Sequence, residues 1–190
     1  MAMVILRRAL LLVLGIAAGV LALPGASLAV DLHPPGEYEV KAAFLYNFTK
    51  YVEWPVQAFQ ESGDSLVICV LGRDPFGSIL DETLRGESVH AKKLAIRRLA
   101  RVDEAAGCHV LFVSSSEERD VARILKAIEG TSVLTVGEVE GFAERGGIIN
   151  LRKEQNKVRF EINVEAAERS GLKISSQLLK LGKIVRSGAE

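Results

Sequence analysis

The chain has 190 residues, in which 24 lysine and arginine residues balance 24 aspartate and glutamate residues. The basic residues are interspersed with acidic ones, which excludes nucleic acid as the expected partner. Arg7 and Arg8 precede the uncharged run ALLLVLGIAAGVLAL, and the small residues Ser27-Leu28-Ala29 follow it. This pattern predicts a secretory signal peptide over residues 1–29, with an uncleaved membrane anchor as the alternative.

Removal of the signal peptide leaves about 160 residues, a size that suits one domain with a single core. The segment that follows it contains His33, Pro34, Pro35 and Gly36. We expect residues 30–36 to be a flexible linker and residues 37–190 to form one exported domain.

Residues 37–54 predict an amphipathic helix that ends before Pro55. Its apolar stripe consists of Val40, Phe44, Phe48 and Tyr51. We interpret this stripe as core packing against a sheet, although an aromatic stripe would also suit a ligand cleft. Tyr46 lies off the stripe and Trp54 at the helix end, so both are predicted to be exposed aromatic residues that contact a partner.

Strands and helices then alternate along the chain. Continuous apolar runs predict buried strands at residues 65–71, 108–114 and 132–136, and residues 93–99 are predicted to form a further strand. Helices are predicted at residues 75–84 and 117–129, with a short helical turn at 102–106. This alternation indicates an α/β sheet that is at least partly parallel.

The pattern changes near the C-terminus. Strands are predicted at residues 148–151 and 157–164, joined by a polar loop at 152–156, and a helix over 175–186 follows, with Leu178, Leu181 and Val185 on one face. The predicted fold is therefore a mixed, largely parallel sheet flanked by helices, with a C-terminal antiparallel hairpin and a final helix.

In the second strand of that hairpin, Val158, Phe160, Ile162 and Val164 point one way. Arg159, Glu161 and Asn163 point the other way. This second row is either a recognition surface or a solvated face on which Arg159 pairs with Glu161.

The sequence GRDPFG at residues 72–77 follows a predicted strand, as a nucleotide-binding loop would. It lacks the lysine of a P-loop and the spacing of a dinucleotide fingerprint. Asp74 is predicted to cap a helix that starts at Pro75, and its charge would repel a phosphate. A small-molecule site near Gly72 and Arg73 stays open, because open α/β sheets bind ligands at the carboxyl ends of their strands.

Cys69 and Cys108 both lie in predicted buried strands. In an exported protein an even number of cysteines favours a disulfide, with a reactive thiol or a metal pair as alternatives. His109 should point to the opposite face of its strand from Cys108, so it is a poor base for that thiol. The three histidines are scattered without the spacing of metal ligands.

The run Ser114-Ser115-Ser116 lacks the glycines of a nucleophile elbow. Ser116 is expected to cap the following helix instead. With no catalytic residue, metal site or cofactor predicted, the residues indicate a protein that is not an enzyme.

Six segments carry a resemblance to the YfiR family: KAAFLYNFTKYVEWP (41–55), VICVLGRDPFG (67–77), CHVLFVS (108–114), VLTVGE (133–138), GGIINL (146–151) and VRFEINVEAAERSGLKISSQLLKL (158–181). The resemblance implies a small non-enzymatic α/β domain in the periplasm. It further implies that the domain represses an inner-membrane diguanylate cyclase and so limits cyclic di-GMP and biofilm formation. A sensor kinase is the alternative partner, and small-ligand sensing the alternative function.

The resemblance also implies that Cys69 and Cys108 form the family's core disulfide. A second cysteine pair of the member that gives the family its name has no counterpart here, because residues 137–151 contain no cysteine. An outer-membrane lipoprotein and a second copy of the chain are further candidate partners.

Overall fold

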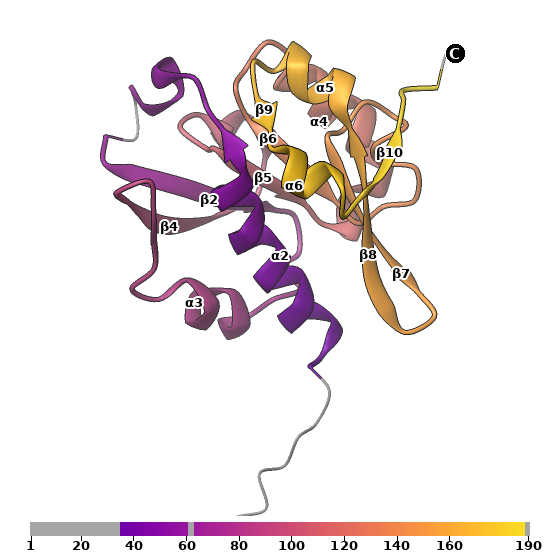
Figure 1. Cartoon of the computed structure of the whole chain (residues 1–190), viewed down its shortest axis with the longest axis horizontal. Coiled ribbons are helices and arrows are strands. Elements are labelled where there is room, and N and C mark those ends of the chain that lie inside the picture. Colours follow the sequence, from indigo (N-terminus) through magenta and orange to yellow (C-terminus); the bar gives the residue numbers. More distant parts are fainter. Residues whose placement is uncertain (1–34, 61–62, 189–190) are drawn as a thin grey trace, which may run out of the picture. The chain divides into compact units, whose positions relative to one another are not determined.

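The computed structural model describes residues 35–60 and 63–188, so the predicted signal peptide and most of the predicted linker lie outside the described residues. The domain is built on an eight-stranded sheet with the order β10-β8-β7-β6-β5-β2-β4-β3, and strands β1 and β9 form a separate pair (Figure 1). The expected mixed, largely parallel sheet with flanking helices is confirmed.

The strands of the large sheet are β2 (Ser65–Leu71), β3 (Ser88–Val89), β4 (Lys92–Leu99), β5 (Val110–Val113), β6 (Leu134–Gly137), β7 (Ile149–Glu154), β8 (Lys157–Asn163) and β10 (Lys183–Val185). Strand β2 is parallel to β4 and β5, β6 is parallel to β5 and β7, and β10 is parallel to β8. The pairs β3–β4 and β7–β8 are antiparallel. Strands β1 (Val52–Glu53) and β9 (Lys173–Ile174) form the small antiparallel pair.

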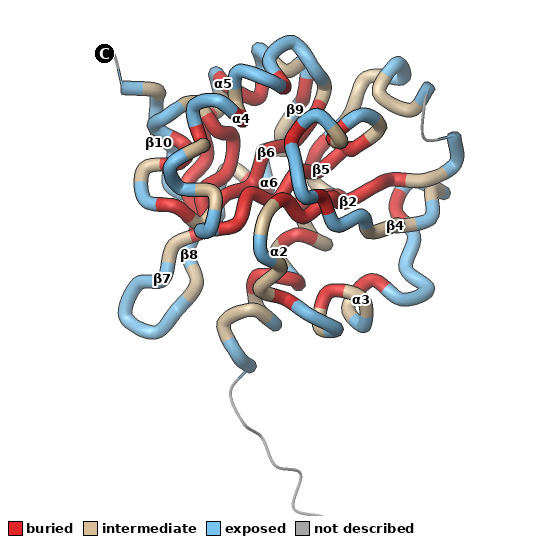
Figure 2. The backbone as a smooth tube through the Cα atoms, turned by 180° about the vertical axis from the view of Figure 1, so that it is seen from behind, coloured by how far each residue is buried: buried red, intermediate tan, exposed pale blue. Residues whose placement is uncertain are grey.

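The helical segments are α2 (Glu37–Tyr51), η1 (Val56–Phe59), α3 (Ser78–Leu84), η2 (Val102–Ala105), η3 (Ser115–Asp120), α4 (Val121–Ala127), α5 (Val164–Arg169) and α6 (Ser176–Leu179). Alternate residues of β2 enter two apolar cores, one with α2 and α3 and the other with η2 and α4. The central strands are therefore covered on both faces, and Figure 2 shows them as a buried band. Within the described ranges, no helix has the length and hydropathy needed to cross a membrane.

Helix α2 is buried on more than the predicted stripe. Phe48 is fully buried, but so are Ala42 and Leu45 on a neighbouring row. The ring of Phe44 packs on Phe160 of β8 at a centroid distance of 5.2 Å, and that of Phe48 at 5.3 Å. The second row is buried because α2 also contacts α3 and α6, so it packs against helices as well as the sheet.

The prediction of one helix over residues 175–186 is wrong in its second half. Helix α6 ends at Leu179, and the chain then forms the edge strand β10. At Gly182 an added Cβ would lie 2.6 Å from Phe160 and 2.8 Å from Ile162. The glycine therefore lets the backbone run close against β8, which a continuing helix could not do.

Two other boundaries also differ from the prediction. Strands β7 and β8 are joined by a two-residue turn, Gln155-Asn156, rather than by a loop of five residues, and both turn residues have positive φ, 46° and 63°. Helix α3 starts at Ser78 and not at Pro75. Asp74 closes a turn by accepting a hydrogen bond from the Phe76 backbone N–H at 2.8 Å, which directs the Phe76 side chain into the core.

Candidate functional site

The residues singled out from the sequence occupy four separate places. Tyr46 lies in α2, Trp54 follows β1, Arg73 follows β2, and Arg159 and Glu161 lie in β8. Of these, only the two residues of β8 are neighbours on one element. The candidate residues therefore do not converge on a single catalytic or ligand site.

Tyr46 and Trp54 are half-buried, so the expectation that both rings are freely exposed is wrong. The hydroxyl of Tyr46 donates to Glu87, and the ammonium of Lys50 lies 3.8 Å from the ring centroid. The indole Nε1 of Trp54 donates to the backbone oxygen of His109 at 3.2 Å. Each ring has an intramolecular contact that explains its position without a partner.

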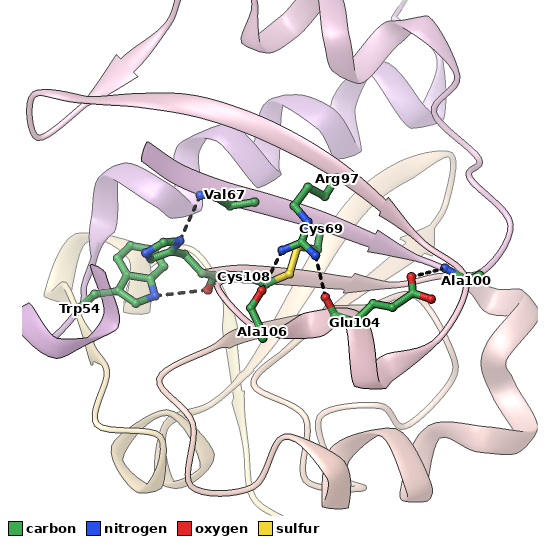
Figure 3. The surroundings of a disulfide bond; sticks show 9 residues. Trp54, Val67, Cys69, Arg97, Ala100, Glu104, Ala106 and Cys108 are labelled. Atoms are coloured by element: carbon green, nitrogen blue, oxygen red, sulfur yellow. Dashed lines mark hydrogen bonds between the residues drawn. A yellow bond between two sulfur atoms is a disulfide. The ribbon is translucent and has the colours of Figure 1, made fainter. Parts of the chain in front are cut away.

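Cys69 and Cys108 form a disulfide that ties β2 to the residue preceding β5 by two positions, with Cα atoms 6.0 Å apart (Figure 3). The guanidinium of Arg97, which pairs with Cys69 in the β2–β4 register, donates to the backbone oxygens of Ala106 at 2.7 Å and Glu104 at 2.8 Å. Both cysteines of the chain are used in this bond, so the reactive-thiol and metal-pair alternatives are wrong.

His109 is fully buried and points away from the disulfide, as the strand alternation predicts. Its Nδ1 accepts a hydrogen bond from the backbone N–H of Val67 at 3.0 Å, and its ring stacks on Phe59 at 4.4 Å. Burial is the main cause that lowers the pKa of His109 to about 4, with a contribution from the charge of Lys92. The imidazole is therefore a neutral structural group at physiological pH.

This buried imidazole should make the fold sensitive to acid. Unfolded histidine has a pKa of about 6.5, so the unfolded chain binds the proton more readily than the fold does. The stabilising contribution is complete above about pH 6.5 and is lost as the pH falls toward 4, by up to about 3 kcal/mol. Urea unfolding at pH 7 and pH 4.5, followed by the fluorescence of the sole tryptophan, Trp54, measures the loss.

The loss between the two pH values should be smaller in His109→Gln, because the buried imidazole that takes up a proton on unfolding is then absent. The matched control His90→Gln changes an exposed histidine and should keep the full pH dependence. Equal pH dependence in His109→Gln and the wild type would contradict the assignment.

The expected ligand crevice near Gly72 and Arg73 is filled by the protein itself. The chain passes from β4 across to β5 on the other side of β2, which makes the carboxyl ends of β2 and β5 the switch point of the sheet. There the hydroxyl of Ser116 accepts from the Arg73 backbone N–H at 2.9 Å. A Cβ added to Gly72 would lie 2.5 Å from that hydroxyl and 2.6 Å from Glu117, so little space remains beside the glycine.

The serine run after β5 serves this local structure. Ser114, and not Ser116 as expected, is the capping residue: its side chain accepts from the backbone N–H of Ser116 at the start of η3. This leaves the hydroxyl of Ser116 to bind the loop after β2. Among described residues, no group of three or more histidine, cysteine, aspartate or glutamate side chains is arranged to hold a metal ion.

A buried ion pair lies near the same edge of the sheet. The ammonium of Lys41 in α2 contacts Glu138, which follows β6, at 2.7 Å, and Glu37 at 2.6 Å. The side chains of Lys41 and Glu138 are 5% and 4% exposed. Burial lowers the pKa of Lys41, but the hydrogen bonds to the two carboxylates outweigh it and raise the pKa above its ordinary value. The pair fixes the first turn of α2 to the sheet.

The polar row of β8 is a mixture of buried and exposed charge. Glu161 is 3% exposed and contacts Arg152 of β7 at 2.8 Å and Lys183 of β10 at 3.0 Å. Hydrogen bonds from these two cations overcome the effect of burial and lower the pKa of Glu161. The expected pairing of Arg159 with Glu161 is therefore wrong.

Four cations share one face of the sheet with this buried carboxylate, and we call them the basic face: Arg152, Lys157, Arg159 and Lys183. Residues that are paired in register, or two apart in a strand, point the same way. Arg152 is opposite Arg159, and Lys183 is opposite Glu161. Lys157 precedes Arg159 by two positions on β8.

Sequence reasoning missed Arg152, Lys157 and Lys183, and also the ion pair of Lys41 with Glu138. The first two were placed in or beside a polar loop, and Lys183 in a helix. The excess of basic residues between positions 152 and 159, where four basic residues stand against one acidic residue, was the available signal.

Two surface grooves lie away from the switch point. One, of about 1070 Å³, is bounded by α4, the turn after β6 and α5, and its lining includes Leu125, Ile128, Thr135, Arg145, Ile148 and Arg169. The other, of about 520 Å³, lies beside Cys108 and η2. Neither contains Gly72 or Arg73.

A family model described as YfiR/HmsC-like matches residues 38–183. A solved structure of a conserved domain protein from Vibrio cholerae O1 biovar El Tor superposes with a TM-score of 0.53 at 14% sequence identity. That match covers 78% of this chain and 60% of the Vibrio chain, so it supports the fold alone.

Proposed function

Because this chain belongs to the YfiR/HmsC-like family, we propose that it is a non-enzymatic periplasmic regulator that binds and represses an inner-membrane signalling protein. The family as a whole has a regulatory role in the context of cyclic di-GMP. A diguanylate cyclase is the proposed partner, and the match over residues 38–183 is the observation that carries the proposal.

Two features of the domain support this proposal. Both cysteines form a buried disulfide, a bond that persists in the periplasm and other oxidising compartments. The position where an open α/β sheet usually binds a ligand is occupied by Ser116 and Glu117 of the same chain. A functional site on the protein surface that contacts another protein is thus better supported than a ligand cleft at the switch point.

Repression requires that the protein bind one state of its partner more tightly than the other, because only differential affinity shifts an equilibrium. The bound state would be the one in which the cytoplasmic catalytic part of the cyclase is inactive. A shift from 1% to 99% inactive cyclase needs about a 10⁴-fold difference in affinity.

Deletion of the gene in the native host should raise intracellular cyclic di-GMP several-fold, because the repressing partner is gone. Mass spectrometry of cell extracts measures the nucleotide, and plasmid-borne wild-type protein should restore the original level. An unchanged level in the deletion strain would overturn the cyclase assignment.

The groove between α4 and α5 favours a second candidate, a small-ligand sensor that acts with a sensor kinase. It combines apolar walls with a few polar groups, as ligand sites do. An unchanged level of cyclic di-GMP, together with a shift in the melting temperature of the pure protein on adding periplasmic extract metabolites, would favour this candidate.

A further inference from the structure

The charge of the β7–β8 hairpin differs from that of the chain as a whole. Lysine and arginine equal aspartate and glutamate in number over all 190 residues, but residues 152–159 contain four basic residues and one acidic residue. The hairpin projects beyond the sheet on the same side as the start of α2 (Figure 1). A concentrated positive charge is thus displayed at a protruding point of the domain.

Within this hairpin one cross-strand pair carries like charges, whereas Glu154 lies opposite Lys157. Arg159 lies directly opposite Arg152, and like charges in that position destabilise a strand pair. Arg152 is compensated by Glu161 at 2.8 Å and more distantly by Glu154 at 3.8 Å. No carboxylate among the described residues lies within 4.0 Å of Arg159 or Lys157, and both side chains belong to exposed residues. These two cations are available to an external anion.

The free cations are held on a rigid support. Lys153 contacts Glu37 of α2 at 2.9 Å, and Phe160 at the base of the hairpin packs on Phe44 and Phe48. The two-residue turn fixes the register at the tip. Binding would therefore cost little ordering of the backbone, which favours affinity.

We infer that the basic face of Arg152, Lys157, Arg159 and Lys183 is the docking surface for an acidic region of the protein partner; this rests on the proposed function. Glu161 and Glu154 lie among these cations and offset part of their positive charge, which weakens the attraction of this face for a diffuse anionic membrane surface. A carboxylate that meets Arg159 directly can still form two parallel hydrogen bonds with its guanidinium. The geometry thus fits placed carboxylates better than a lipid surface.

The test uses the deletion strain complemented with full-length variants. Lys157→Glu/Arg159→Glu reverses the two free cations, and the control Lys93→Glu/Arg119→Glu makes the same charge change at exposed residues on β4 and η3. Close charge pairs in protein interfaces commonly contribute tenfold or more each, so the first variant should bind its partner at least about 100-fold more weakly. It should leave cyclic di-GMP at the level of the deletion strain, while the control restores repression.

Immunoblots of the periplasmic fraction and melting of the purified variants confirm that both are folded and equally abundant. Restored repression by both variants would overturn the docking surface and leave the proposed function intact. No rise of cyclic di-GMP on deletion would overturn the two together. Wild-type binding to vesicles of phosphatidylglycerol and phosphatidylcholine that Lys157→Glu/Arg159→Glu abolishes would assign the face to lipid and overturn the protein partner.

Discussion

Cys69→Ala/Cys108→Ala should lower the free energy of unfolding by about 4 kcal/mol, because the disulfide closes a long loop in the unfolded chain. The two cysteines are 39 positions apart in sequence, and both are buried, so the cross-link restricts the unfolded state without exposing a reducible bond to solvent. Such a loss is a large share of the stability of a typical domain. Urea unfolding monitored by Trp54 fluorescence measures it.

The wild-type protein unfolded in the presence of a thiol reductant is the internal control. Its midpoint should move to that of the alanine variant, because both then lack the same cross-link. Arg97, the register partner of Cys69, also holds this part of the chain by donating to the backbone oxygens of Ala106 and Glu104. A loss below about 1 kcal/mol would mean that these contacts, and not the disulfide, fix the start of β5.

The middle of the sheet could be predicted because its strands are buried in apolar cores on both faces. Residues 65–71 and 110–113 are apolar almost without interruption, and β2 and β5 are buried accordingly. A continuous apolar run of this length is typical of a parallel strand that is covered on both faces, so it can be recognised without knowledge of its neighbours. The same local evidence predicted Cys69 and Cys108 in buried strands, and the disulfide followed from the resemblance and from the even count; Cys108 in fact lies two residues before β5.

The C-terminal region could not be predicted in the same way, because its structure depends on contacts across the sheet. The residues after Leu179 have helical spacing, but the close approach of Gly182 to Phe160 and Ile162 places them in a strand. Lys183 then becomes a partner of Glu161, which no local pattern could reveal. The error in the final helix and the error in the pairing of Arg159 therefore have one cause.

The position of Asp74 is a second instance in which tertiary contacts override a local signal. An aspartate before a proline predicts a helix start. Here the carboxylate accepts from Arg98 of β4 at 2.7 Å, and Arg98 also donates to the Gly77 oxygen at 3.0 Å. Helix α3 begins only after this contact with the neighbouring strand.

Lys41→Met should cost about 4 kcal/mol of stability, because it leaves the carboxylate of Glu138 buried without its cation. The Glu138 side chain is 4% exposed, and without Lys41 it would keep a hydrogen bond from the Ser115 backbone N–H, at 3.1 Å, but no contact with the lysine charge. The matched control is Lys153→Met, which removes a lysine from the exposed pair with Glu37 and should cost less than about 1 kcal/mol. Urea unfolding of the two variants gives the comparison.

A second substitution separates the cost of an unpaired charge from the worth of the pair. In Lys41→Met/Glu138→Gln the uncharged amide can still accept from Ser115, so the double variant should be more stable than Lys41→Met alone. A cost equal to the sum of both single changes would show that the two side chains act independently. If the double variant instead recovers the stability of the wild type, the ion pair adds little to stability over neutral side chains. Its main effect would then be to fix where α2 begins on the sheet, next to the hairpin that carries the basic face.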